Sequence, residues 1–270
     1  MSSHTIDELG FLSPDIQFWI RKHRTENQEW FALSEELSLI GQRQLALLNV
    51  PAHDNRALAA ALLFIRTLSG FQGAVALAER GMTQEARTLT RGCFENVFYL
   101  GAAHKDATFA DTLIRDDVSR RKVLARILLK DSAGLDDGHI NKLSSFLGDL
   151  EQSGLQGENI KIARMAELAG LKSIYDVYYR GLSNDAAHPS VTALNHYLDA
   201  DDEGFVRGLR WGPNVSDVAG TLCTACTAAV YVISMMNDAH KQEGISSELE
   251  RCWTEYKRLI ALESGKAQVE

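Results

Sequence analysis

The chain has 270 residues, of which 45% are hydrophobic, and it carries a formal net charge of −8. This length and apolar content allow one large domain with a sizeable core, and only four prolines leave room for long helices, because proline breaks helices. The acidic balance excludes a surface that coats nucleic acid generally, which would be basic, although a nuclease would need only a local positive pocket.

Hydrophobic periodicity predicts a succession of helices along most of the sequence. After a flexible arm at residues 1–14, apolar residues recur at helical spacing from Phe18 to Leu47, and Pro51 ends this segment. Asp54 is a good N-cap for the helix that follows. The further predicted helices cover about residues 55–80, 83–104, 108–130, 137–150, 159–168, 172–187, 215–241 and 246–262, before a polar tail at 263–270.

The period of the pattern changes after His188-Pro189, where the residue before proline is pushed out of the α region. Residues 192–198 and 205–211 are short segments rich in β-branched and aromatic side chains, separated by a turn-rich loop. We therefore predict an all-α, multi-helix bundle with a small β-hairpin inserted at about residues 192–211. No repeat or linker divides the sequence, so a single helical domain spanning all 270 residues is expected.

Cysteine usage and the N-terminal sequence indicate a cytoplasmic protein. Cys223-x-x-Cys226 has metal or redox spacing, but it lies in an apolar helical run without a second ligand pair, so core packing is the favoured interpretation. The first residues show no signal-peptide pattern. Residues 57–77 and 219–236 approach the length of a membrane span but contain polar interruptions, and we interpret both as core helices. No membrane association, metal or cofactor is expected.

The first candidate cluster is Arg87-x-x-x-Arg91-x-x-x-Glu95. Residues four apart lie on one helix face, and the surrounding sequence is strongly apolar, so these charges are expected to be partly buried and paired. One interpretation is an internal ion pair that positions the helix. The other is that the two arginines hold an anion while Glu95 orients one of them.

The second candidate cluster places Ser183, Asn184, Asp185 and His188 at the end of the 172–187 helix. Asn184 and His188 are four apart and share a face, and Asp185 could orient the imidazole ring. The C-terminal end of a helix favours a cationic ring, so His188 could change its charge near neutral pH. Helix capping by these polar side chains is the alternative.

His196 lies on the first predicted strand, close in sequence to His188. A metal site that uses both histidines is conceivable. However, no further carboxylate ligand can be named for it, and no metal site is predicted.

The chain resembles the DUF5677 family, a family of unknown function, over about residues 58–222. The resemblance rests on two motifs, which are Glu85-Ala86-Arg87-x-Leu89-x-Arg91-x-x-x-Glu95 and Tyr179-x-x-x-Ser183-x-x-x-x-His188-Pro189-Ser190. This resemblance implies no particular activity.

The second motif is more distantly similar to the HEPN ribonucleases, helical bundles of bacterial toxin and defence systems that carry an Arg and a His close together. Seven residues separate Arg180 from His188 here, which departs from that pattern, so Arg87 or Arg91 would have to supply the positive charge. The likeness implies metal-independent RNA cleavage with His188 as general acid or base. In that scheme Arg91 or Arg87 stabilises the developing phosphorane charge, and Ser183 and Asn184 position the phosphate.

We rank a binding module for an anion or a partner, together with a purely structural role, above catalysis. The expected partners are RNA or a small anionic ligand and a second copy of the chain. Self-association is predicted because Trp19, Trp30 and Phe31 lie on an N-terminal helical segment with more apolar surface than the fold can cover. Whichever role holds, Arg91 or Glu95 is predicted to lie within reach of Ser183 or His188.

Overall fold

A computed structural model describes residues 5–51, 53–131, 134–154, 157–201, 203–242 and 244–266, without the side chains of residues 264–266. The helical elements are α1 (Ile6–Leu9), η1 (Gly10–Leu12), α2 (Ile16–Glu26), α3 (Gln28–Ala46), α4 (Asn55–Ala78), α5 (Thr83–Lys105), α6 (Phe109–Lys130), α7 (Asp137–Gln152), α8 (Ile162–Ala169), α9 (Lys172–Ile174), η2 (Tyr175–Tyr179), α10 (Arg180–Leu182), η3 (Ser183–Ala187), α11 (Val191–Asn195), α12 (Val218–His240) and α13 (Ile245–Lys266). The strands β1 (Leu198–Ala200) and β2 (Val206–Leu209) form an antiparallel hairpin. The predicted fold class, a mostly α-helical bundle with a small hairpin, is confirmed.

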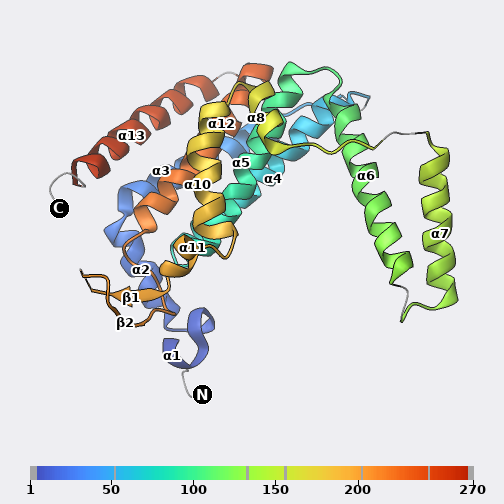
Figure 1. Cartoon of the computed structure of the whole chain (residues 1–270). Helices are drawn as coiled ribbons and strands as arrows, with labels where there is room; N and C mark the ends of the chain where they lie inside the picture. Colours follow the sequence, from blue (N-terminus) through green and yellow to red (C-terminus); the bar gives the residue numbers. More distant parts are fainter. Residues whose placement is uncertain are drawn as a thin grey trace.

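The core lies between α3, α4, α5 and α12, with α13 packed against α3 and α12 (Figure 1). Its large, fully buried side chains include Phe64 of α4, Phe94 and Phe98 of α5, and Leu222 of α12. Such positions recur on the inner faces of these helices, whereas α4 also exposes apolar side chains, among them Leu58, Leu62 and Ile65. This bundle fixes the ends and the faces of α5 and α12, where the candidate sites lie.

Side-chain caps start several helices where the sequence places a suitable residue. The Asp54 carboxylate accepts a hydrogen bond from the Ala57 amide at 2.9 Å, which confirms the predicted N-cap of α4. The Ser190 hydroxyl accepts from the Ala193 amide at 3.0 Å in the same way. Each cap satisfies an amide that has no partner within its helix.

The described part of the N-terminal region contains several short elements in addition to long helices. The described part of the supposed arm at residues 1–14 contains α1 and η1, and the apolar segment after it is two helices that break at Asn27, whose φ is −121°. Trp30 and Phe31 are only 3% and 2% exposed, because α3 packs them into the core. The surface from which self-association was predicted is therefore largely interior.

The C-terminal expectation also changes. α13 continues to Lys266, so the polar tail predicted at 263–270 begins as helix. Residues 267–270 lie outside the described residues.

The hairpin is shorter than predicted. Residues 192–195, expected on the first strand, belong to α11, because the Ser190 cap favours a helical turn over extended chain. His196 consequently lies in the turn after α11 rather than on a strand. The remaining strands pair Leu198 with Leu209, and a register irregularity follows at Asp199.

α6 and α7 form a helical hairpin that projects from the bundle, so that the molecule has the outline of an arch (Figure 1). We call this hairpin, Phe109–Gln152, the arm. α6 touches the bundle chiefly through its first turns and packs along α7. No described residue of α7 is buried, so the arm stands largely on its own.

α4 and α12 are long and apolar enough to cross a membrane by length and composition. In their most apolar stretches, 39% of the α4 residues and 61% of the α12 residues are buried inside the protein. Core helices of ordinary globular proteins pass the same test, so the observation is weak evidence for a membrane span.

Candidate functional site

The predicted helix over 172–187 forms, but two of its turns, η2 and η3, are π-helical. A π turn holds one residue more than an α turn and is frequent at functional sites. The segment lies along α5. Arg91 Nε of α5 donates to Ser183 Oγ at 2.8 Å, so the prediction that the two polar clusters meet is confirmed.

Arg91 uses its whole guanidinium group within the protein. Besides Ser183, Nη2 donates to the Tyr179 hydroxyl at 2.6 Å, and Nη1 lies 3.2 Å from Glu95 Oε1. The guanidinium carbon also sits 4.7 Å from the centre of the Tyr179 ring, within cation–π range. Arg91 thus ties α5 to the 172–187 segment through Ser183 and Tyr179, while Glu95 holds the guanidinium from α5 itself.

Tyr179 closes this part of the network. Its hydroxyl donates to Glu95 Oε1 at 2.9 Å. Burial, reinforced by the Glu95 carboxylate, raises the pKa of the Tyr179 phenol to about 12. The phenol therefore stays protonated at neutral pH and acts as a fixed hydrogen-bond donor.

Arg87 is less exposed than Arg91, since only 14% of its side chain is exposed, against 25% for Arg91. Its Nη1 donates to Asp185 Oδ2 at 2.8 Å, and its Nε donates to Thr221 Oγ1 at 3.1 Å. Nη2 lies 3.6 Å from Asp217 Oδ1, just before α12. Arg87 therefore joins three segments that are far apart in sequence.

His196 completes the cluster in a place that the sequence did not suggest. Its Nε2 lies 2.5 Å from Asp185 Oδ1, and its Nδ1 lies 3.6 Å from Asp217 Oδ2. Both aspartates therefore face His196 as well as Arg87. We call this set the arginine network; its members are Arg87, Arg91, Glu95, Tyr179, Ser183, Asp185, His196, Asp217 and Thr221.

His188 and Asn184 lie apart from the arginine network. Both are exposed, and their described hydrogen bonds are made by backbone carbonyls, which accept from the Ser190 amide and hydroxyl. His188 has extended backbone angles, φ −121° and ψ 148°, so the helix ends before Pro189 as predicted. Of the seven predicted site residues, the structure brings together Arg87, Arg91, Glu95, Ser183 and Asp185.

The charges of the arginine network oppose the binding of an added anion. Three carboxylates, Glu95, Asp185 and Asp217, face two arginines. Every guanidinium nitrogen of Arg87 and Arg91 already has a partner within the protein. A bound anion would have to displace a carboxylate that is fixed to the same scaffold.

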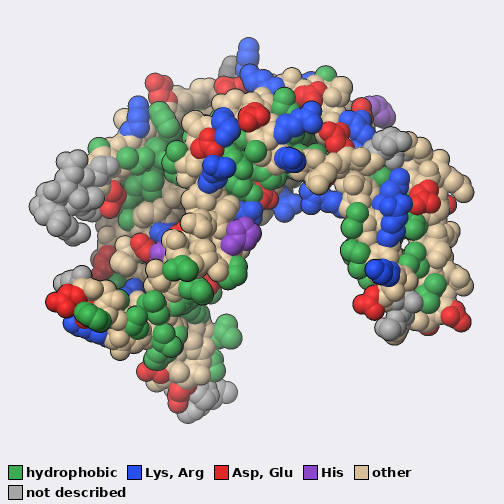
Figure 2. All heavy atoms as spheres, in the orientation of Figure 1, with side chains coloured by type: hydrophobic (Ala, Val, Ile, Leu, Met, Phe, Trp, Pro, Cys, Tyr) green, Lys and Arg blue, Asp and Glu red, His purple; other side chains and the backbone are tan. Residues whose placement is uncertain are grey.

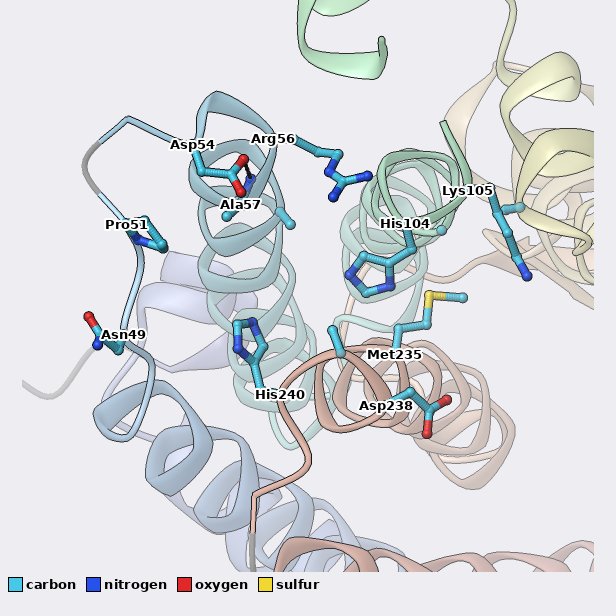
Figure 3. Close-up of a pocket in the computed structure, with 14 residues that line it drawn as sticks. Asn49, Pro51, Asp54, Arg56, Ala57, His104, Lys105, Met235, Asp238 and His240 are labelled. Carbon is cyan, nitrogen blue, oxygen red and sulfur yellow. Dashed lines mark hydrogen bonds between the residues drawn. The ribbon is translucent and has the colours of Figure 1, made fainter. Parts of the chain in front are cut away.

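A second polar group lines a cavity of about 740 Å³ at the opposite end of α5. Figure 3 shows Arg56 from the start of α4, His104 and Lys105 from the end of α5, and His240 from the end of α12 around this space. Its walls also include apolar side chains, among them Met235. We call it the helix-end cavity.

The basic side chains of the helix-end cavity lack acidic partners. Within the described part of the chain, no carboxylate forms an ion pair with Arg56, His104, Lys105 or His240. Of the two lining acids, Asp54 is engaged in capping α4, and the Asp238 carboxylate points away from the two histidine rings (Figure 3). The pKa of His104 is lowered by burial and then by the nearby His240, Arg56 and Lys105, against the opposing effect of Asp238.

The Cys-x-x-Cys pair packs in α12 as a structural feature. Cys226 is fully buried and Cys223 is partly buried. Burial raises the pKa of the Cys226 thiol to about 12, so it remains protonated. Among the described residues, no group of three or more His, Cys, Asp or Glu side chains is arranged to hold a metal ion.

Fold and sites together define a helical-bundle protein with a projecting two-helix arm, one saturated arginine network and one open basic cavity. Residues 57–205, more than half of the chain, match the model of the family of unknown function DUF5677, and the chain belongs to this family. The matched region includes Arg87, Arg91 and the 172–187 segment but ends before Asp217 and α12. No curated protein and no solved structure gives a significant match.

Proposed function

We propose that the protein is a binding module for a small organic anion and that the ligand occupies the helix-end cavity. The observation that carries this proposal is the gathering of Arg56, His104, Lys105 and His240 around one cavity without a described acid paired to any of them. His104 is partly buried, whereas Arg56, Lys105 and His240 are exposed at the rim of the cavity, where an anion entering from solvent would meet them. A phosphate, sulfonate or carboxylate group would supply the missing negative charge.

The cavity suits an anion with an apolar body rather than a bare inorganic ion. Its volume of about 740 Å³ lies within the range of roughly 300–1,000 Å³ that is usual for small-molecule sites. Ala57, Ala60, Ala169 and Met235 supply apolar wall on one side of the basic group. A charged head could meet Arg56 and His104 while a ring or chain lies against these side chains.

The arginine network then has a structural role. It ties α5 to the 172–187 segment and to the start of α12, and its donors are already engaged. This division assigns ligand binding to the cavity and rigidity to the network.

Phenyl phosphate, with phenol as its neutral analogue, tests the proposal by calorimetry at low ionic strength and pH 6.5. Phenyl phosphate should bind and phenol should bind at least tenfold more weakly, since the charged head supplies the main interaction. Arg56→Gln and His104→Gln should each weaken phenyl phosphate binding about tenfold, equivalent to about 1.4 kcal/mol.

Arg207→Gln is the matched control, because Arg207 is an exposed arginine on the hairpin, far from the cavity in sequence and contacts. It should leave binding unchanged. Equal binding of phenol and phenyl phosphate, or equal losses in Arg56→Gln and Arg207→Gln, would contradict the proposal.

RNA cleavage stays a prediction that no described contact favours. His188 is exposed, and Arg91 is held by Tyr179, Ser183 and Glu95. An assay on single-stranded RNA with wild-type protein and His188→Ala decides it: cleavage that disappears in the variant would support the ribonuclease interpretation.

A further inference from the structure

The outer part of the arm exposes a continuous apolar stripe. Val123, Leu124, Ile127 and Leu128 of α6 are 54%, 57%, 57% and 39% exposed, and Phe146 of α7 is 36% exposed. Val123 and Ile127, and likewise Leu124 and Leu128, are four positions apart, so each pair forms a neighbouring row on the surface of α6. Figure 2 shows hydrophobic side chains on the side of α6 that faces the hollow of the arch.

This stripe is distinct from the face of α6 that packs against α7. α6 buries Val118 and Ala125, which are seven positions apart, and α7 is the helix that packs along this part of α6. α6 thus carries two apolar faces, and only one is covered. Two helices alone rarely make a stable unit, because each must bury its apolar stripe against another layer.

The charge balance of the arm favours a second copy of the arm over nucleic acid as its partner. Between Phe109 and Gln152 there are seven basic and eight acidic side chains, a net charge of −1 in a chain that carries −8. Arg120, Arg121 and Arg126 are paired with Asp116, Asp117 and Glu151 of the same arm. The arm therefore attracts no polyanion and does not repel a second copy of itself.

The arm is also large enough for a stable contact. Its longer helix has 22 residues, which corresponds to about 33 Å, and two packed helices present a face about 20 Å wide. The whole face of the arm, polar flanks included, has an outline of about 650 Å², against the ~800 Å² that each partner of a standard interface buries; the stripe from Val123 to Leu128 is its apolar centre.

We propose that two copies of the chain associate through their arms, the α6 stripe of one against that of the other, to form a four-helix bundle. Such a two-fold contact is self-complementary, since the same stripe serves both copies. The bundle gives α6 and α7 the interior that the single chain does not provide.

The test compares Leu124→Glu/Ile127→Glu with Leu39→Glu by sedimentation equilibrium. Leu39 lies on α3 and is 59% exposed, much like Leu124, so it controls for adding charge to an exposed leucine. Wild type and Leu39→Glu should be dimers at micromolar concentration. The double variant should associate about 100-fold more weakly or not at all, because each dimer would bury four carboxylates.

Hydrogen exchange on the wild-type protein keeps the test independent of any folding defect in the variants. Amides of α6 and α7 should become more protected as the protein concentration rises, while those of α4 and α12 should not. Wild-type protein that stays monomeric at about 100 µM would overturn the proposal. A dimer that survives in the double variant, or one that is lost in Leu39→Glu, would overturn it as well.

Discussion

The arginine network and the helix-end cavity use the same kinds of side chain in opposite ways. Around Arg87 and Arg91, three carboxylates, two hydroxyl side chains and a phenol take up every guanidinium nitrogen. Around Arg56 and His104, the charged neighbours are mostly other basic groups, and the pKa of His104 is lowered first by burial and then by these groups. A cluster of arginine and histidine therefore indicates a ligand site only when no carboxylate of the same protein pairs with it.

The largest expected effect is the loss of stability on breaking the network. Arg87→Ala should lower the free energy of unfolding by about 3 kcal/mol, because Asp185 and Asp217 would lose the guanidinium and keep only His196 as a shared partner. Urea denaturation measures this. The exposed Arg207→Ala should give no measurable change, and equal losses in both variants would show that the network has no special role.

A smaller loss is expected from Tyr179→Phe, which keeps the ring and removes the hydroxyl. The hydroxyl joins Arg91 to Glu95, so its removal should cost about 1–2 kcal/mol. Tyr175→Phe is the matched control, since Tyr175 stacks on Tyr179 and has no described hydroxyl hydrogen bond. A loss in Tyr175→Phe as large as in Tyr179→Phe would place the effect in ring packing.

The environment of His104 in the helix-end cavity should affect how the free energy of unfolding changes with pH. An unfolded histidine has a pKa of about 6.5, and the folded pKa of His104 is lower. The unfolded state therefore binds more protons below pH 6.5, and stability falls as the pH drops below that value. His104→Gln should reduce this fall, and an unchanged profile would count against the described environment of His104.

An anion of fixed charge tests whether a ligand contacts His104. Benzenesulfonate keeps its single negative charge between pH 8 and pH 6, so any change in its affinity reports on the protein. Its binding should strengthen as the pH falls, because protonation of His104 adds positive charge to the cavity. NMR titration should show the pKa of His104 rise when benzenesulfonate is present, and a pKa that stays in place would exclude contact.

The smallest effect is expected from His188→Ala. His188 is exposed, and its described hydrogen bond is made by the backbone. The change should alter the free energy of unfolding by less than about 0.5 kcal/mol. A loss above about 1 kcal/mol in thermal unfolding would show that His188 belongs to the arginine network after all.

Local signals in the sequence predicted much of the fold and part of the network. Asp54 capped its helix, and Pro189 ended the 172–187 segment, because these effects act within a few residues. Arg91 met Ser183 because both are polar residues on apolar helices and needed partners. Arg87 and Asp185 met for the same reason.

Other features depend on long-range packing and were missed. Asp217 and Thr221 reach Arg87 from more than 120 positions away in sequence, and no local pattern marks them. The helix-end cavity joins Arg56, His104 and His240, each of which alone is an ordinary helix-end residue. His196 is a different case, because the Ser190 side chain, a local signal, caps the short helix α11 and so keeps His196 off the predicted strand.

The two π turns also determine where the chain can lose one residue and keep its helix. Each wide turn between Tyr175 and Ala187 accommodates one residue more than an α turn, so a single codon can be lost there and the segment can close up as ordinary helix. A deletion of Asn184 would spare the helix but change the direction in which Asp185 projects relative to Arg87. Homologues with one residue fewer at this point should therefore also differ at position 87 or 217.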